Sequence, residues 1–254
     1  SNGGGFLMPV AIVIAGILIS GAVIFKDQIQ VKIGGEAKVA GLATQKPQNP
    51  PAGDNPETQN SPVPAPVARV ELPLGESGFL GEASASVTVT EFTDFQCPAC
   101  QGFFTNFFSQ IKAELIDTGL VKYVTKHFPL TFHPYAAKAA EAAECAKDQK
   151  KFSEYHDLLF TSSWITTADP TEELLISTFV GLAKTLGLNT AAFKTCLTSG
   201  SKKATVDTDF ELGRKVGVSG TPTVYVNGLL AGKPGYIPTF GDIKELVDRE
   251  LQGR

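Results

Sequence analysis

The fold of this chain is decided by residues 91–100, EFTDFQCPAC. The segment that leads into it, VTVTEF at residues 87–92, is rich in β-branched residues and is typical of a strand. After it, apolar side chains recur every three or four residues over residues 104–115, which predicts a helix with one apolar face. Cys97 and Cys100 are therefore expected where a strand leads into the first turn of a helix.

The start of a helix is a favourable place for a thiolate. It presents backbone N–H groups that have no partner within the helix, and it carries the positive end of the helix dipole. The sequence therefore predicts an acidic, nucleophilic thiol at Cys97, with Cys100 one turn further along as the resolving thiol. A buried structural disulfide and half of a zinc site are the alternatives, but a zinc site normally takes four ligands from two cysteine pairs. The spacing favours a redox pair.

The composition describes a chain with one good-sized core and further segments. It has 254 residues, of which 43% are hydrophobic. Its net charge of −4 is small and it contains no basic stripe, so we expect no nucleic-acid partner. The three histidines, His127, His133 and His156, are not spaced like a known set of metal ligands. We therefore expect neither a metal nor a cofactor.

Residues 6–25 form an uncharged stretch, FLMPVAIVIAGILISGAVIF, of the length that crosses a bilayer as one helix. A cleaved signal peptide is the alternative, but its apolar core would be about 7–15 residues long and a small-residue cleavage site would follow it. Lys26, Asp27 and Gln28 follow instead. We therefore expect residues 1–5 to be a short tail and residues 6–25 to be an uncleaved transmembrane anchor.

The expected orientation of the anchor depends on redox chemistry. Lys26 and Lys32 follow the span, and taken alone they argue against an N-terminus on the cytoplasmic side. Persistent disulfides, however, need an oxidising compartment outside the cytosol. We therefore expect a single-pass protein of the cell membrane, with its catalytic domain on the extracytoplasmic side.

Residues 26–66 separate the anchor from the globular part of the chain. From residue 47 onward this segment is rich in Pro, Asn and Gln, so it has too little apolar surface to fold and its prolines keep it extended. We expect a Pro-rich linker here and one globular domain over residues 67–254. Within the domain, residues 68–72 are predicted to form an edge strand and residues 120–125 a further strand.

The rest of the domain begins with helical patterns and returns to strands near its end. Alanine-dense or amphipathic segments predict helices over residues 136–147, 152–159, 174–186 and 190–197. Later signals predict a strand at 222–226, an Asn-Gly hairpin turn, a return strand at 229–232 and a closing helix over 243–251. The domain is therefore expected to be an α/β fold interrupted by a helical block.

Several ordered motifs of this domain match those of one family. They are EFxDFxCPxC at residues 91–100, HFPL at 127–130, AAECA and FxxYHDxLF within 142–160, and GVxGTPTxxVNG at 217–228. Together they resemble the DsbA-like branch of the thioredoxin-fold disulfide oxidoreductases, in particular its membrane-anchored bacterial and archaeal forms. The resemblance implies a thioredoxin-like fold with a helical insertion, here at about residues 133–207.

The resemblance also implies roles for residues outside the cysteine pair. Glu91 matches a buried carboxylate that relays protons for the resolving thiol, with a surface carboxylate at the strand end as the alternative. Thr221 and Pro222 match a cis-proline dipeptide that faces the redox pair and binds the backbone of an extended substrate. A trans-proline at the start of an edge strand is the alternative for Pro222. Asp94 is expected to be a loop or helix-capping group.

Two further features follow from the same resemblance. The active-site dipeptide is Pro98-Ala99, whereas the most oxidising members of the family carry His at the second position, so we expect a weaker oxidant than a Cys-Pro-His-Cys protein. Cys145 and Cys196 match a structural disulfide that related proteins often carry, with a second, relay dithiol as the alternative. Closing such a loop of about 50 residues is worth about 4 kcal/mol in the loop-entropy estimate.

These features predict a thiol:disulfide oxidoreductase that forms disulfide bonds in exported, cysteine-containing proteins through Cys97 and Cys100. The family requires a membrane partner for reoxidation, quinone-linked and of the DsbB or vitamin K epoxide reductase (VKOR)-like kind. A disulfide isomerase or reductase is the first alternative, although the Pro-rich linker does not resemble the dimerisation domain of the usual periplasmic isomerase. The second alternative is a non-enzymatic holdase of the cell envelope that binds unfolded chains.

Overall fold

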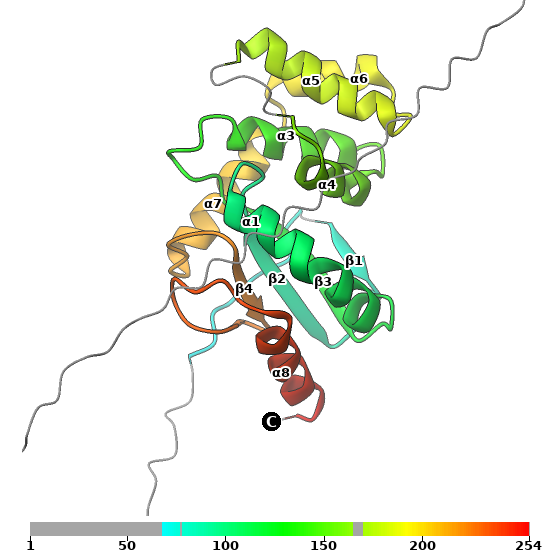
Figure 1. Cartoon of the computed structure of the whole chain (residues 1–254). Helices are drawn as coiled ribbons and strands as arrows, with labels where there is room; N and C mark the ends of the chain where they lie inside the picture. Colours follow the sequence, from blue (N-terminus) through cyan, green and yellow to red (C-terminus); the bar gives the residue numbers. More distant parts are fainter. Residues whose placement is uncertain (1–67, 77, 165–169, 254) are drawn as a thin grey trace, which may run out of the picture. The chain divides into compact units, whose positions relative to one another are not determined.

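The structure is a computed structural model that describes residues 68–76, 78–164 and 170–253. The predicted tail, anchor and linker, residues 1–66, lie outside these ranges. Among the residues that are described, no helix has both the length and the apolar character needed to cross a membrane. Figure 1 shows the arrangement of the globular domain.

The domain is built on a five-stranded mixed sheet with the strand order β1-β3-β2-β4-β5. Its strands are β1 (Phe79–Gly81), β2 (Val87–Thr93), β3 (Val121–His127), β4 (Thr223–Val226) and β5 (Leu229–Leu230). β2 and β3 run parallel, whereas β1 pairs with β3, and β4 with β2, in the antiparallel direction. The strand that leads into the cysteine pair therefore lies at the centre of the sheet.

The central strand β2 is buried on both faces. Val87 and Val89 pack in one core cluster with Tyr123 of the neighbouring strand. Phe92 belongs to a separate cluster on the opposite face. Since successive residues of a strand point to opposite faces, Glu91 shares the face of Val87 and Val89. The alternation in VTVTEF thus places a carboxyl group between the sheet and the helix that follows.

One continuous helical segment follows the cysteines. It consists of α1 (Pro98–Phe103), the π-helical stretch η1 (Phe104–Phe108), α2 (Ser109–Ile111) and the π-helical stretch η2 (Lys112–Ile116). Pro98 occupies the first helical turn, where the missing N–H of proline removes no intrahelical hydrogen bond. Ile111 and Leu115 are fully buried in the same cluster as Val87 and Val89. This packing holds the helical segment against the face of the sheet that carries Val87 and Val89.

A block of helices is inserted between β3 and β4. It contains α3 (Ala136–Lys147), α4 (Phe152–Thr161), α5 (Glu172–Thr185), α6 (Thr190–Ser199) and α7 (Lys203–Lys215), and after the β4–β5 hairpin the chain closes with α8 (Phe240–Leu251) (Figure 1). The core of this block includes Phe95, Cys97 and Cys100, so it is continuous with the redox pair. The predicted thioredoxin-like α/β fold with a helical insertion is confirmed.

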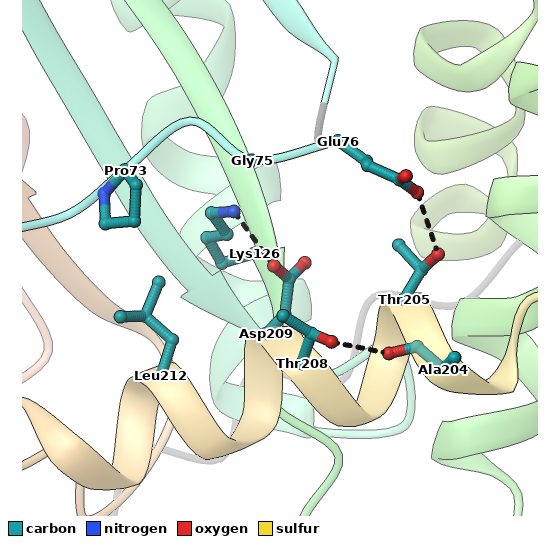
Figure 2. A pocket seen from close by; sticks show the side chains of 9 residues that line it. All are labelled: Pro73, Gly75, Glu76, Lys126, Ala204, Thr205, Thr208, Asp209 and Leu212. Atoms are coloured by element: carbon teal, nitrogen blue, oxygen red, sulfur yellow. Dashed lines mark hydrogen bonds and ion pairs between the residues drawn. The ribbon is translucent and has the colours of Figure 1, made fainter.

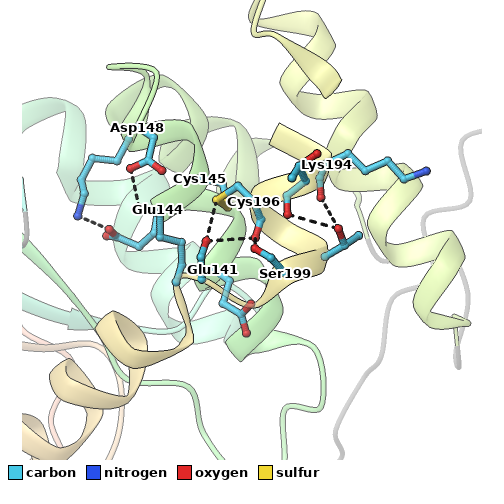
Figure 3. Close-up of a disulfide and its surroundings, with 12 residues drawn as sticks. Glu141, Glu144, Cys145, Asp148, Lys194, Cys196 and Ser199 are labelled. Atoms are coloured by element: carbon cyan, nitrogen blue, oxygen red, sulfur yellow. Dashed lines mark hydrogen bonds and ion pairs between the residues drawn. A yellow bond between two sulfur atoms is a disulfide. The ribbon is translucent and has the colours of Figure 1, made fainter. Parts of the chain in front are cut away.

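A disulfide joins two helices of the inserted block. Cys145 of α3 and Cys196 of α6 form this bond across a sequence separation of 51 residues (Figure 3). Cys145 is fully buried, so the bond lies in the core of the block rather than beside Cys97. In the described part of the chain, the free cysteines are Cys97 and Cys100.

The edge of the sheet differs from the sequence-based prediction. Residues 68–72 form no strand, although the Val70 N–H donates to the Gly228 carbonyl at 2.9 Å. The two edge strands are β1 and β5, whose three and two residues are too few to show a pattern of alternation. The prediction of a strand at residues 68–72 is therefore wrong, and its apolar side chains instead mark a segment that packs beside the sheet.

Helix α7 has a mixed buried face that the sequence pattern does not reveal. Its buried residues are Val206, Asp209 and Gly213. The Asp209 carboxylate accepts a hydrogen bond from the Lys126 ammonium at 2.9 Å, and both side chains are almost fully buried beside a cavity of about 420 Å³ (Figure 2). Lys126 also donates to the Leu74 carbonyl at 2.8 Å. This ion pair therefore joins β3, α7 and the segment before β1.

The expected end of the insertion, residue 207, falls within α7.

Candidate active site

The Cys-x-x-Cys pair lies where β2 ends and α1 begins. Cys97 is the N-cap residue of α1, and Cys100 lies inside its first turns. Cys100 is completely buried, whereas 7% of Cys97 is exposed. A cavity of about 250 Å³ adjoins Cys97, and its lining includes Gln96, Gln101 and Trp164. A sulfur atom of another protein can therefore reach Cys97, while Cys100 is shielded.

The surroundings of Cys97 favour its thiolate. They lower the pKa of the thiol from 9.0 to about 5. The hydrogen bond from the Cys100 thiol is the largest cause, and burial of Cys97 opposes it in part. The Thr221 side chain and the backbone N–H groups of Ala99 and Cys100 add to the stabilisation. These N–H groups belong to the first turn of α1, where the helix itself offers no acceptor.

Cys100 has the opposite character. Burial, the hydrogen bond with Cys97 and the negative charge of Glu91 raise the pKa of its thiol well above the ordinary value. Glu91 is only 2% exposed, and burial raises the pKa of its carboxyl group as well. The site thus combines an acidic outer thiol with an inner thiol that retains its proton beside a carboxyl group of increased proton affinity.

Tyr123 holds the Glu91 carboxyl group in place. The Tyr123 hydroxyl donates a hydrogen bond to Glu91 Oε2 at 2.5 Å, and both side chains are buried. Burial and the charge of Glu91 raise the pKa of Tyr123 well above its ordinary value, so the phenol remains a donor. The sequence alone gives no signal for this contact. It depends on the parallel register of β2 and β3, in which Val89 lies opposite Tyr123.

The loop before β4 contacts Cys97 directly. The Thr221–Pro222 peptide bond is cis, and the Thr221 carbonyl oxygen lies 3.6 Å from the Cys97 sulfur. The Thr221 hydroxyl is buried and has no hydrogen-bond partner among the described residues. It is therefore available to donate to the thiolate. The structure brings Cys97, Cys100, Glu91 and the Thr221-Pro222 dipeptide together in one site.

Asp94 fixes the loop that carries Cys97. Its buried carboxylate accepts hydrogen bonds from the backbone N–H groups of Gln96, at 2.7 Å, and Leu130, at 2.8 Å. His133 Nδ1 lies 2.8 Å from the same carboxylate. Asp94 therefore joins the loop before α1 to the segment after β3, which is a structural role. The sequence indicated a loop group here, but the partners Leu130 and His133 are too distant along the chain to be predicted.

The remaining predicted features add no further ionisable group between the cysteines. Pro98 and Ala99 separate them, and neither side chain carries charge. Within the described ranges, no three His, Cys, Asp or Glu side chains are grouped so that they could hold a metal ion. Each histidine has its own carboxylate neighbour: Glu144 for His127, Asp94 for His133 and Asp157 for His156.

The chain is similar to known disulfide-forming proteins in sequence and in structure. Residues 74–248 match the family model Thioredoxin_4, described as thioredoxin. A Bacillus anthracis protein named probable disulfide bond formation protein D is 34% identical over 180 residues, which cover 68% of this chain and 77% of that protein. The crystal structure of oxidised BdbD from Bacillus subtilis has a TM-score of 0.62 and 28% identity, covering 74% of this chain and 99% of that one.

A relative of another kind is much longer. The Na⁺/H⁺ antiporter NhaA 3 of Salinispora tropica is 37% identical over 149 residues, which cover 58% of this chain but 21% of that protein. This chain therefore spans about a fifth of the antiporter relative and most of the Bacillus relative. The family match and the Bacillus proteins show that the chain belongs to the thioredoxin family. Within that family it is a DsbA-like thiol:disulfide oxidoreductase.

The Thr221 hydroxyl offers a direct test of the thiolate environment. We expect Thr221→Val to raise the midpoint of Cys97 ionisation by about one pH unit, the equivalent of one lost hydrogen bond to a charged group. Thiolate absorbance near 240 nm, titrated in the reduced protein, measures this midpoint. Thr221→Ser keeps the hydroxyl and is the matched control, which should stay near the wild-type value of about 5. Equal midpoints in the valine and serine variants would contradict the assignment.

Proposed function

We propose that this protein oxidises pairs of thiols in exported proteins to disulfide bonds, using the disulfide between Cys97 and Cys100. The observation that carries the proposal is the contrast between the two thiols, since the pKa of Cys97 is lowered to about 5 and that of Cys100 is raised. A sulfur that is stable as a thiolate is a good leaving group, so a disulfide that contains it is readily transferred. For the same reason, the reduced state of the Cys97–Cys100 pair is favoured over its disulfide.

The reaction proceeds through a mixed disulfide. A substrate thiolate attacks the Cys97 sulfur, the bond between Cys97 and Cys100 breaks, and the Cys100 sulfur leaves and takes up a proton. A second substrate thiolate then attacks the substrate sulfur that is bound to Cys97. Cys97 leaves as a thiolate, and the substrate keeps the new disulfide. Two electrons have moved from the substrate dithiol to the protein.

Glu91 is proposed to supply the proton that Cys100 needs. Its buried carboxyl group acts electrostatically on Cys100 and has a raised pKa, as a group that exchanges protons with a thiol requires. Tyr123 keeps the carboxyl group oriented through its 2.5 Å hydrogen bond. Glu91 would therefore protonate the departing Cys100 during oxidation of the substrate. It would accept the proton again when Cys100 attacks the Cys97 sulfur of a mixed disulfide formed with the reoxidant.

The Thr221-Pro222 dipeptide and the cavity beside Cys97 are proposed to bind the substrate. The Thr221 backbone lies at the Cys97 sulfur, where a substrate segment that carries the attacking cysteine would pass. An extended segment can pair with exposed backbone groups by strand-like hydrogen bonds, which do not depend on its side chains. The adjoining cavity of about 250 Å³ then accommodates side chains near that cysteine. Such binding suits clients of many sequences.

A membrane partner is proposed to regenerate the disulfide. Each cycle leaves Cys97 and Cys100 reduced, so continued oxidation needs an electron acceptor, and a quinone-linked protein of the DsbB or VKOR-like kind would supply it. We further propose that residues 6–25 anchor the chain in the cell membrane, with residues 67–254 on the extracytoplasmic side. The basis for this location is the apolar sequence together with the compartment that stable disulfides require.

Trapping the mixed disulfide tests the proposed reaction. We expect Cys100→Ser to accumulate covalent complexes with cysteine-containing exported proteins, because the resolving sulfur is missing while Cys97 still reacts. Cys97→Ser is the matched control, and it should form no such complexes and oxidise no dithiol substrate. Non-reducing gels and mass spectrometry identify the products. If Cys97→Ser retained full activity, the holdase alternative would be supported. If the wild-type protein reduced disulfides in the cell faster than it formed them, the reductase or isomerase alternative would be supported instead.

The location is tested separately with the full chain. We expect the full chain to remain in membranes after alkaline washing, and a variant lacking residues 6–25 to be released. After brief treatment with a reductant that opens the Cys97–Cys100 disulfide, a thiol reagent that cannot cross membranes should label Cys97 in intact cells that carry the full chain. Labelling that requires membrane disruption would contradict the extracytoplasmic placement.

A further inference from the structure

The loop between α7 and β4 carries Thr221 but has few backbone contacts of its own. Its beginning is held, because Val218 is buried and its N–H donates to the Gly213 carbonyl at 2.9 Å. Pro222, at its end, is buried as well. Residues 219–221 between them are exposed or half-buried, and within the described part of the chain they make no backbone–backbone hydrogen bond. The position of these three residues therefore depends on side chains.

Two side chains bond to this stretch, those of Thr223 and Cys97. The Thr223 hydroxyl donates a hydrogen bond to the Gly220 carbonyl at 2.7 Å. The Cys97 thiol donates to the Thr221 carbonyl at a distance of 3.6 Å. A cysteine in a disulfide has no hydrogen to donate, so the second bond is absent from the oxidised protein. Of the two contacts, the one from Thr223 therefore remains in the state that meets a substrate.

The bond from Thr223 determines which way the Gly220–Thr221 peptide faces. This peptide is trans, and the carbonyl oxygen and N–H of a planar trans peptide point in opposite directions. Because the Gly220 oxygen is turned toward the Thr223 hydroxyl, the Thr221 N–H points to the other side. That N–H finds no acceptor among the described residues, so it is available to a ligand.

The Thr221 N–H lies on the side of the loop that faces Cys97. Thr221 precedes a proline, a position that favours an extended backbone. The N–H and the carbonyl of an extended residue lie on the same side, which lets two antiparallel residues exchange both hydrogen bonds. The Thr221 carbonyl is the group at the Cys97 sulfur. Thr221 therefore presents one donor and one acceptor to a segment that approaches that sulfur.

Gly220 explains why a hydroxyl is needed to hold this peptide. Glycine has more backbone freedom than any other residue, and a Cβ atom added to Gly220 would meet no atom within 4 Å. Side-chain packing therefore does not restrict the peptide. Thr223, in contrast, is the first residue of β4 and pairs with Phe92 of the central strand. The hydroxyl thus extends from the sheet to the most loosely held part of the loop.

We propose that Thr223 is a positioning residue of the substrate site, whose hydroxyl holds the Gly220–Thr221 peptide in the orientation that pairs with the backbone of an extended substrate segment. The inference deepens the proposed function and rests on it. Thr223 acts through Gly220 on Thr221 and not on the reacting sulfur atoms. Its effect is therefore expected only with substrates that have a peptide backbone beside the reacting cysteine.

Two thiol substrates separate this effect from a general one. The full chain, oxidised at Cys97 and Cys100, is mixed with a flexible peptide that contains two cysteines, or with dithiothreitol, which has no peptide backbone. Trp164, the single tryptophan of the chain, lines the cavity at Cys97, so its fluorescence is a suitable signal. We expect Thr223→Val to slow the peptide reaction on the order of fivefold, the effect of one neutral hydrogen bond. The dithiothreitol reaction should be unchanged.

Two control variants and one modified peptide complete the experiment. Thr223→Ser keeps the hydroxyl and should restore the wild-type rate with the peptide. Tyr225→Phe removes another hydroxyl of β4, which bonds to the Val216 carbonyl at 3.3 Å, and it should retain both rates. A peptide N-methylated on the residues that flank its reactive cysteine cannot pair along that edge. It should react more slowly with the wild type, and Thr223→Val should cause no further slowing, because both changes remove one interaction.

Several results would overturn the inference. Equal peptide rates in the wild type and Thr223→Val would do so, as would equal slowing with the peptide and with dithiothreitol. A wild-type protein that reacts equally fast with the parent and the N-methylated peptides would overturn it without any variant having to fold. If the wild type oxidised neither the peptide nor dithiothreitol, the proposed function itself would fail, so the two failures are distinguishable.

Discussion

The rest of this structure depends on the stabilisation of one anion, the thiolate of Cys97 at the start of α1. The Cys100 thiol and the first-turn N–H groups act on it from its own helix, whereas the Thr221 side chain acts on it from 124 residues further along the chain. β2 brings the helix start to the centre of the sheet, and the loop before β4 lies beside it. The fold is therefore a means of holding several donors around one sulfur atom.

The buried layer beneath that sulfur has the opposite electrostatic character. Burial raises the pKa of Cys100 and of Glu91, and Tyr123 retains its proton beside them. A surface thiol that ionises easily thus lies over an interior that keeps its protons. This contrast favours transfer of the disulfide. It also means that the proton that Cys100 takes up or releases must be exchanged with a buried group.

The local elements of this site could be predicted from sequence, whereas the contacts between distant elements could not. The alternation in residues 87–92 and the apolar spacing in residues 104–115 are local signals, and they indicated β2 and the helix after the cysteines. The hydrogen bond from Tyr123 depends on strand register, which no local pattern specifies. Helix α7 escaped prediction because its buried face contains Asp209 and Gly213, which weaken the apolar periodicity.

The stability of the reduced protein relative to the oxidised one tests the central claim most directly. The folded pKa of Cys97 is lowered from 9.0 to about 5, so its contribution to stability is full above pH 9 and is lost as the pH falls toward 5. With the Cys145–Cys196 bond intact in both forms, urea unfolding should show the reduced form to be more stable at pH 7. That excess should shrink by about 2 kcal/mol at pH 5, after allowance for partial solvent screening. A difference that does not change with pH, or an oxidised form that is the more stable at pH 7, would contradict the account.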